Sequence, residues 1–242
     1  MKDTLQGLED LFFNNNNASS SATPLTVTGK TFKSFKVANS GNVSLTGDLV
    51  VTEELTIDSG TLSSEQKIQA GSVVIKNSGL LTHHSTTTTN EYKLEITTET
   101  LSIDSTSKID VSGKGYLGAY SGGNNTSTGM TFGNTTVGGS TGNSGGSYGG
   151  LGGKSGANKV YGDYTNPNEL GSGGGSDYGS GGSGGGLIRI TANSIQLDGE
   201  IKADGGNSTY RVAGSGGGIF VNTNSLSGAG KITANGGNRL SG

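Results

Sequence analysis

Cysteine and tryptophan are absent from this chain of 242 residues, and proline and methionine occur only twice each. Without cysteine there are no disulfide bonds, thiol nucleophiles or thiolate metal sites. Only 29% of the residues are hydrophobic, so the sequence does not supply one large globular core. We therefore expect a thin, repetitive core that is stabilised by packing and hydrogen bonds.

Long apolar runs and an excess of positive charge are also lacking. No segment approaches the roughly 20 apolar residues that cross a bilayer, and the segment after Met1 carries acidic residues where a signal peptide has an apolar stretch. The chain has 16 Lys and Arg against 19 Asp and Glu, without a basic stripe that would neutralise a phosphate backbone. We expect neither a membrane span nor a nucleic-acid partner.

Glycine is the abundant residue, with 47 copies, which is well above the usual share of roughly 7%. Glycine and proline together stay below the roughly 25–30% that is typical of low-complexity disorder. The net charge of −3 is too small to hold the chain open by self-repulsion. These values favour an ordered, glycine-rich fold over a disordered chain.

The first 24 residues have a pattern of their own. Apolar residues at steps of three and four follow two capping residues and predict a short amphipathic helix, which ends at the asparagine run of residues 14–17 and is followed by a linker up to Pro24. The helix would either cover the end of the fold or serve self-association or attachment. Its capping and apolar residues are Asp3, Thr4, Leu5, Leu8, Leu11 and Phe12.

From Leu25 onward, short β-type segments are separated by Gly, Asn, Asp or Ser. Apolar residues alternate with polar ones, which predicts strands with one buried face. The residues expected on the buried side are Val43, Leu45, Leu49, Leu55, Ile57, Val73, Ile75, Leu94, Ile96, Leu101, Ile103 and Ile109.

A repeat is clearest late in the chain, where SIQLDGEIKADGG at residues 194–206 aligns without gaps on SLSGAGKITANGG at residues 225–237, 31 residues later. Ile195 then matches Leu226, and Ile201 matches Ile232. A unit this short buries its apolar residues only if the next unit stacks on it. The repeat therefore predicts an all-β fold, a parallel and right-handed β-helix, over an antiparallel sandwich, which also uses short alternating strands.

The spacing between matching positions is uneven and indicates insertions. Ile57 and Ile75 are 18 residues apart, Ile75 and Ile103 are 28 apart, and Ile103 and Leu197 are 94 apart. We expect a Gly/Tyr-rich insertion at residues 113–186 between the first coils, residues 25–112, and the last coils, residues 187–242. Its glycine runs are compatible either with extended, polyproline-II-like packing against the coils or with a flexible loop.

Four stretches carry a family resemblance: IDVSGKGYLG, NELGSGGG, GGGLIRITANSIQLDGEIKADGG and SGGGIFVNTNSLSGAGKITANGG. They resemble the Gly-rich β-helix repeats of large bacterial surface and secreted proteins, with similar stretches in viral fibre proteins. The likeness extends over roughly residues 94–238. It implies the architecture only, because those proteins share no single chemistry.

Candidate catalytic and metal-binding residues are sparse. His83 and His84 are adjacent, so on a strand they point to opposite faces, and we expect an exposed loop pair that does not jointly hold a metal. Four aspartates recur at expected turns, which favours turn formation over a Ca²⁺ site or paired catalytic carboxylates. Arg189 is expected on the outer side of a strand, away from other arginines. The four weak metal candidates are Asp104, Asp110, Asp198 and Asp204.

Tyrosines on the glycine-rich insertion are the remaining candidates for a binding surface. Tyrosine rings stack on sugar faces and lose little conformational entropy on binding, although the same rings also serve to pack a loop onto the coils. The candidate ligand-binding residues are Tyr116, Tyr120, Tyr148, Tyr161, Tyr164 and Tyr178.

Together these features predict a non-enzymatic structural or adhesive module of an extracellular, cell-surface or virion fibre protein, with a cell-surface glycan or receptor as its partner and no cofactor. One alternative is a polysaccharide-active lyase or hydrolase of the phage tail-fibre or tailspike kind. Another is an ice- or mineral-binding protein, which would need a flat threonine ladder. The consecutive residues Thr86–Thr89 alternate in direction and so disfavour that ladder.

Overall fold

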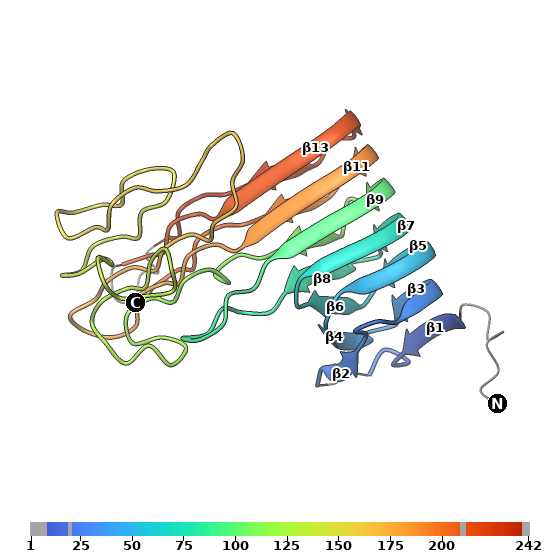
Figure 1. Cartoon of the computed structure of the whole chain (residues 1–242), viewed down its shortest axis with the longest axis horizontal. Coiled ribbons are helices and arrows are strands. Elements are labelled where there is room, and N and C mark those ends of the chain that lie inside the picture. Colours follow the sequence, from blue (N-terminus) through green and yellow to red (C-terminus); the bar gives the residue numbers. More distant parts are fainter. Residues whose placement is uncertain (1–8, 19–20, 209–211, 239–242) are drawn as a thin grey trace.

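The computed structural model describes residues 9–18, 21–208 and 212–238, and these residues form fourteen strands and no helix. Figure 1 shows the strands as a stack of coils with the glycine-rich segment to one side. The strands are β1 (Glu9–Asn14), β2 (Thr23–Thr26), β3 (Thr31–Ala38), β4 (Asn42–Thr46), β5 (Leu49–Asp58), β6 (Thr61–Ser64), β7 (Lys67–Lys76), β8 (Leu80–His83), β9 (Leu94–Ile103), β10 (Lys108–Asp110), β11 (Leu187–Leu197), β12 (Glu200–Lys202), β13 (Gly218–Ser227) and β14 (Lys231–Thr233).

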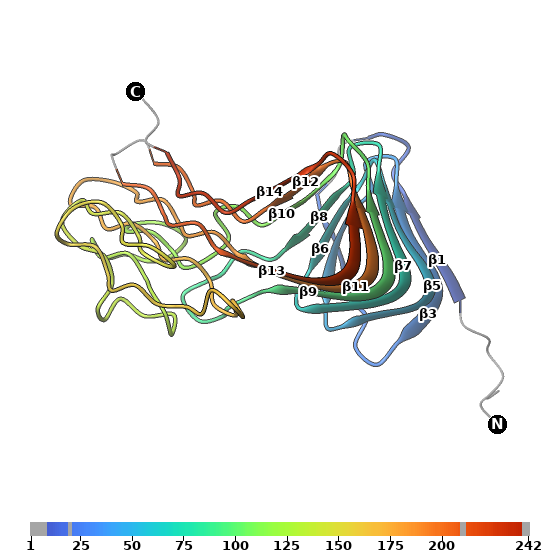
Figure 2. The same ribbon diagram turned by 90° about the horizontal axis from the view of Figure 1, so that it is seen from above.

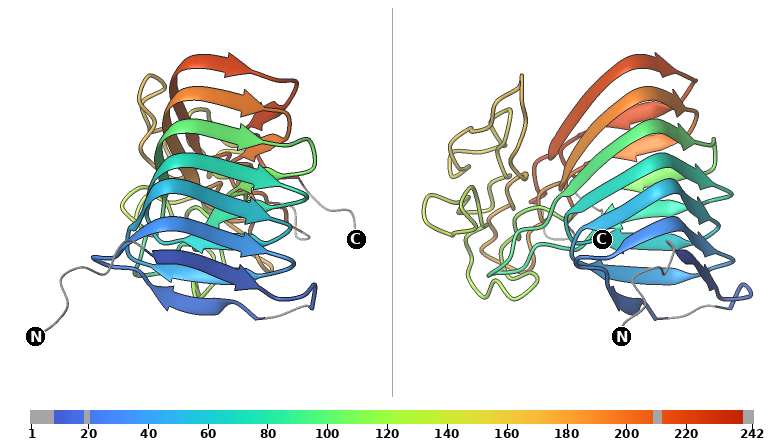
Figure 3. Two further views of the ribbon diagram at one scale, coloured as in Figure 1. Left: turned by 90° about the vertical axis from the view of Figure 1, so that its right-hand side faces the viewer. Right: turned by 45° about the vertical axis from the view of Figure 1, so that its right-hand side comes forward.

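The strands alternate between two parallel sheets of seven strands each. The odd-numbered strands form one sheet in the order β1-β3-β5-β7-β9-β11-β13, and the even-numbered strands form the other in the matching order. Each coil therefore contributes one long and one short strand, and each strand pairs with its equivalent in the next coil, as Figure 3 shows. This is a parallel β-helix-like solenoid.

The register of the sheets confirms the matches expected from the sequence. Ile57 pairs with Ile75, and Ile75 pairs with Ile103. Leu197 pairs with Ile103 across the 94-residue interval. The 31-residue repeat is the register between the neighbouring strands β11 and β13 and between β12 and β14, where Ile195 pairs with Leu226 and Ile201 with Ile232.

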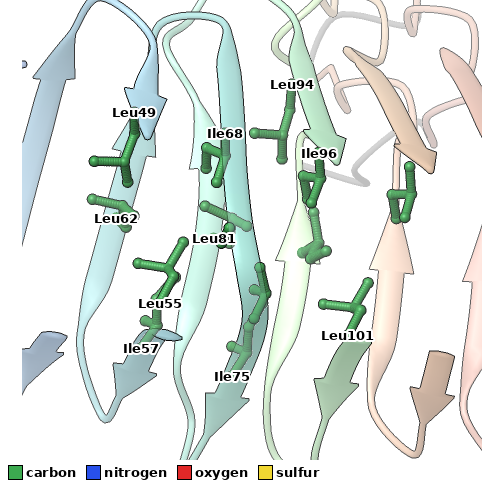
Figure 4. Packing of buried hydrophobic residues seen from close by; sticks show 14 of the residues in the cluster. Leu49, Leu55, Ile57, Leu62, Ile68, Ile75, Leu81, Leu94, Ile96 and Leu101 are labelled. Atoms are coloured by element: carbon green, nitrogen blue, oxygen red, sulfur yellow. The ribbon is translucent and has the colours of Figure 1, made fainter. Parts of the chain in front are cut away.

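The core is a narrow aliphatic column inside the coils (Figure 4). All twelve residues expected on the buried side are buried. Along β9 the inward positions are Leu94, Ile96 and Thr98, followed by Leu101 and Ile103. The step of three residues between Thr98 and Leu101 marks the corner at which the long strands bend in Figure 2. Alternation on both sides of this corner lets one strand form two walls of the column.

The prediction of an N-terminal helix with a linker is wrong for the residues that the structure describes. Leu11 and Phe13 turn toward the core in β1, which pairs in parallel with β3, while Phe12 points outward beneath the Lys36 ammonium group. The expected linker overlaps the start of β2, which pairs with β4. The unpaired edge of β3 offers β1 backbone hydrogen bonds and an apolar face, and aromatic residues favour strands. Asp3, Thr4, Leu5 and Leu8 lie outside the described residues.

The glycine-rich insertion is a bundle of extended segments that bond backbone to backbone. Within residues 169–176, Gly171 and Gly174 donate to the carbonyls of Gly185 and Gly182, whereas Gly173 and Ser176 donate to Met130 and Ser127. Every third residue thus faces the same neighbouring segment, which is the periodicity of a polyproline-II helix with three residues per turn. We call residues 111–119, 127–131, 139–148, 169–176, 180–187, 203–206, 212–218 and 234–237 the glycine bundle.

Close packing explains the glycines inside this bundle. A Cβ atom at Gly173 would lie 2.1 Å from the carbonyl oxygen of Leu117, and one at Gly184 would lie 1.9 Å from that of Gly171. The colliding atoms belong to the backbone, so they do not swing aside as a side chain would. Ordered packing of the insertion, one of the two alternatives left by the sequence, is therefore what the structure contains.

Candidate functional site

A small second core joins the glycine bundle to the coils. It contains Tyr116, Leu117, Met130, Leu170 and Leu187, with Tyr161 packed against it. Leu187 begins β11, so the last residues of the bundle run directly into a core strand. From this junction the segments 111–119 and 180–187 extend away from the sheets, side by side, for roughly 20 Å at about 3.1 Å per residue.

The six candidate tyrosines fall into two groups. Tyr116 is only 1% exposed, and burial raises its pKa above the usual range. Tyr161 donates a hydrogen bond to the Leu170 carbonyl at 2.6 Å, and its ring lies 5.2 Å from that of the half-buried Tyr148. These three tyrosines hold the bundle together. Three others present large exposed fractions, 44% for Tyr120, 96% for Tyr164 and 77% for Tyr178.

Tyr120 and Tyr178 belong to adjacent loops at the end of the bundle that is farthest from the sheets. The Ser180 hydroxyl donates to the Tyr120 carbonyl at 2.9 Å, and Gly181 donates to Ala119 at 2.8 Å. A third loop joins them, because the Asn143 amide and the Asp177 carboxylate are hydrogen-bonded at 2.8 Å. We call these loops, residues 120–126, 142–143 and 176–180, the far-end loops.

A groove of about 1070 Å³ lies beside β13. Its lining comes from residues 143–146, from the loop of residues 148–167, from residues 212–219 and from residues 232–237. The apolar and aromatic residues that line it are Tyr148, Leu151, Val160, Tyr161, Tyr164, Pro167, Val212, Ala213, Ile219, Ile232 and Ala234.

The charged groups around the groove are few and partly engaged. Among its lining residues, Lys154 and Asp163 are the charged ones, and the Asp163 carboxylate accepts hydrogen bonds from Thr165 that lower its pKa below the usual value. Arg189 lies outside the groove on β11, with its guanidinium 4.4 Å from the Phe220 ring centroid. It donates hydrogen bonds to the Pro167 carbonyl and the Asn166 side chain, and so anchors the end of the loop of residues 148–167 that lines the groove.

Burial raises the pKa of the Tyr148 hydroxyl to about 12. The cause is loss of solvent around the hydroxyl, with the negative charge of Glu169 adding to the effect. The Tyr148 hydroxyl therefore stays protonated at neutral pH. A Cβ atom at Gly218 would lie 3.1 Å from this hydroxyl, so the ring is wedged against the start of β13.

The expectation that both histidines are exposed is wrong for His83, which is fully buried, while His84 is half-buried. Burial lowers the pKa of His83 to about 3, and it also lowers that of His84. The His84 Nε2 atom lies 3.0 Å from the Ser44 hydroxyl, a contact that sequence spacing did not indicate. Among the described residues, no carboxylate is hydrogen-bonded to His84. The Ser44–His84 pair therefore lacks the third member of a catalytic triad.

The four aspartates are turn residues that link neighbouring coils or close their own turn. Their carboxylates accept hydrogen bonds from the backbone nitrogens of Asn77 (Asp104), Ser112 (Asp110), Ala229 (Asp198) and Asn235 (Asp204). Burial alone would raise the pKa of Asp104 and Asp110, but hydrogen bonds hold both pKa values below the usual range. Among the described residues, no group of three or more His, Cys, Asp or Glu is arranged to hold a metal ion.

Sequence reasoning missed Asn158 and the groove itself. The buried Asn158 side chain hydrogen-bonds Thr131, Ser140, Ser147 and Ser172 and so joins three segments of the bundle. Asn158 carries no local signal, because its partners are up to 27 residues away. The groove did have a local sequence signal in Leu151 and Val160, which are apolar residues in a largely polar loop. Both are exposed in the structure.

Within the described residues, no helix has the length and apolar character needed to span a membrane. A scan against protein-family models found no matching family, and searches of curated proteins and of solved structures found no match to this chain.

Proposed function

We propose that this chain is a non-enzymatic adhesive module of an extracellular, cell-surface or virion fibre protein. In this proposal the solenoid, wound right-handed as in the Gly-rich repeats that the sequence resembles, acts as a rigid support. The far-end loops bind a glycan or a receptor through Tyr120 and Tyr178.

One observation carries the proposal: exposed tyrosines sit on loops that are held by a glycine bundle with a dense hydrogen-bond network. Aromatic rings left exposed by a scaffold that buries other tyrosines are typical of binding surfaces. Because the supporting segments are already ordered, binding does not require a further loss of backbone entropy. The Asn143–Asp177 pair likewise orders the loops before a ligand arrives.

The enzyme alternative gains no specific support. The aspartates that would serve as paired carboxylates are engaged with backbone nitrogens, and Arg189 is engaged with the loop at residues 166–167. A glycosidase of the usual kind needs two free carboxyl groups on either side of the scissile bond. We therefore place the binding surface, and not a reaction centre, in the glycine-rich region.

The test compares the wild type with the double variant Tyr120→Ala/Tyr178→Ala on a glycan array and on whole-cell or particle binding. We expect at least about a tenfold loss of affinity, because aromatic anchors dominate binding surfaces of this kind. Tyr92→Ala, a tyrosine on the coils beside His84, is the matched control. Full binding by the double variant, or release of oligosaccharides in a parallel depolymerisation assay, would show the proposal to be wrong.

A further inference from the structure

Within the described residues, neither the backbone conformation nor the packing explains why four positions are glycine. Gly149, Gly150 and Gly153 would carry a Cβ with no atom within 4 Å, and the nearest atom to a Cβ at Gly236 is the Gly214 carbonyl oxygen at 3.9 Å. None of the four has a positive φ. Every other described glycine either has a positive φ or would place its Cβ within 3.2 Å of a neighbouring atom.

All four of these glycines line the groove beside β13. A glycine that neither the backbone conformation nor intrachain packing requires is explained by close approach of something outside the chain. The unexplained glycines come from two separate lining segments, with Gly236 in residues 234–237 and Gly149, Gly150 and Gly153 in the loop of residues 148–167. The occupant of the groove therefore comes close to the backbone of both segments.

The surroundings of the groove indicate what that occupant is. Elsewhere in the chain, a glycine-lined space between extended segments holds another extended glycine-rich segment. Residues 234–237 are at the edge of the bundle, bonded to residues 203–206 through Gly205 and to residues 212–218 through Gly237. Ala234, Gly236 and Gly237 of this edge segment line the groove. Its tyrosines and Pro167 also suit a polyproline-II segment, since such segments dock in aromatic-lined grooves.

The edge strand β13, next to the groove, has an unpaired side and an exposed apolar residue. β13 pairs with β11 on one side only, and it carries Leu226, 54% exposed, where the equivalent Leu101 and Ile195 are fully buried. Ile232 on β14 is 43% exposed, although Ile201 beside it is buried. At the opposite end of the solenoid, the short edge strand β2 contains Pro24, which lacks the backbone donor that pairing requires. The short edge strand β14 contains no proline.

We propose that the groove binds a glycine-rich extended segment of another polypeptide, and that a strand following this segment adds to β13. In this chain the glycines of residues 183–186 run directly into β11, and those of residues 215–217 run into β13, so the two binding elements are contiguous. An intact second copy does not supply them, because its own copies of these segments are already bonded within its coils. This inference goes beyond the adhesive function: it assigns an assembly surface that is distinct from the far-end loops.

The experiment titrates the full chain with a synthetic peptide of residues 183–197, SGGGLIRITANSIQL, by calorimetry and by NMR. A control peptide, SAAALIRITANSIQL, keeps the strand but carries Cβ atoms that prevent close approach. The protein variant Gly150→Leu/Gly236→Leu fills the groove at positions where space is open. Glu99→Leu adds a leucine to an exposed position on β9, outside both the groove and the far-end loops.

We expect the wild type and Glu99→Leu to bind the glycine peptide, with at least a tenfold loss of affinity for the alanine peptide and for the groove-filling variant. Equal binding of both peptides, no binding, or no effect of the groove-filling variant would overturn the proposal. Sedimentation of the wild type provides a further check. A dimer that the peptide does not dissociate would also overturn the proposal, because the groove and the edge of β13 would then bind a second copy of the chain. The variant Tyr120→Ala/Tyr178→Ala should still bind the peptide, which separates this inference from the adhesive proposal. Displacement of the peptide by a glycan would instead show that the groove binds the glycan, and would overturn the inference.

Discussion

His83 and Leu187 are joined by a hydrogen bond although 104 residues separate them, with the Leu187 backbone nitrogen donating to the His83 Nε2 atom at 3.3 Å. The other ring nitrogen donates to the His84 carbonyl at 2.6 Å, so the imidazole is neutral and protonated at Nδ1. The Lys114 ammonium donates to the His83 carbonyl, also at 2.6 Å. His83 thus connects β8 to the point where the glycine bundle runs into β11.

Loss of stability on mild acidification follows from this arrangement. The pKa of His83 is about 3 in the folded chain against 6.5 for an ordinary histidine, so between these values the unfolded chain binds the additional proton. Stability due to His83 is therefore fully present above about pH 6.5 and declines as the pH falls, by about 2 kcal/mol at pH 5.

The check is urea unfolding at pH 7 and pH 5 for the wild type and for His83→Gln, which keeps an acceptor for Leu187 but does not titrate. We expect the difference between the two pH values to shrink by about 2 kcal/mol in the variant. His84→Asn is the companion variant, because burial also lowers the pKa of His84. An identical pH dependence in the wild type and in His83→Gln would contradict the prediction.

Glycine at position 173 is required by packing, and glycine at position 150 is not. A Cβ at residue 173 would meet the Leu117 carbonyl oxygen at 2.1 Å, whereas a Cβ at residue 150 would meet nothing within 4 Å. We expect Gly173→Ala to lower the free energy of unfolding by about 3 kcal/mol or more, because backbone atoms have to shift. Gly150→Ala should stay within about 0.5 kcal/mol of the wild type. Similar costs for both substitutions in chemical denaturation would argue against the close packing of the bundle.

Leu101 and Leu226 occupy the same column of the solenoid in different coils, since each pairs in register with Ile195. Leu101 is buried and Leu226 is half exposed. Leu101→Ala should therefore cost about 2–5 kcal/mol, as buried leucines do, and Leu226→Ala less than about 1 kcal/mol. The melting temperatures of the two variants provide the comparison. A large cost at Leu226 in the isolated chain would mean that this surface is already covered.

Ca²⁺ should not stabilise this chain. The carboxylates of Asp104 and Asp204 already accept hydrogen bonds at 2.7 Å from the backbone nitrogens of Asn77 and Asn235 in neighbouring coils. A cation at either turn would have to replace those hydrogen bonds, so we expect the same melting temperature with chelator as with millimolar Ca²⁺. Asp204→Ala should cost about 0.5–1.5 kcal/mol through the lost hydrogen bonds, in either condition. A rise in melting temperature with Ca²⁺ that Asp204→Ala abolishes would indicate a metal site.

The solenoid was predictable because its signal is local and repeated. Ile57, Ile75 and Ile103 were matched from the pattern alone and do pair across neighbouring strands. Alternation with a period of two predicts which side chains turn inward, and the 31-residue repeat predicts the register between neighbouring strands. The spacing of Leu11 and Phe12 predicted a helix, but both residues lie in a strand because the edge of β3 favours pairing with β1. The prediction that His83 is exposed was wrong for a related reason. Its burial depends on Leu187, which is distant in sequence and lies where the glycine bundle runs into β11.

The sequence by itself determined the all-β class, the inward column of aliphatic residues, the position of the glycine-rich insertion and the turn role of the aspartates, because each depends on neighbours in the chain or on an exact repeat. Only the tertiary structure decided that β1 joins the sheet, which tyrosines are buried and which exposed, and that four glycines face an open groove. These outcomes depend on which extended segments come to lie side by side. A glycine run fits many neighbours equally well until the backbone hydrogen bonds of the whole bundle select one arrangement.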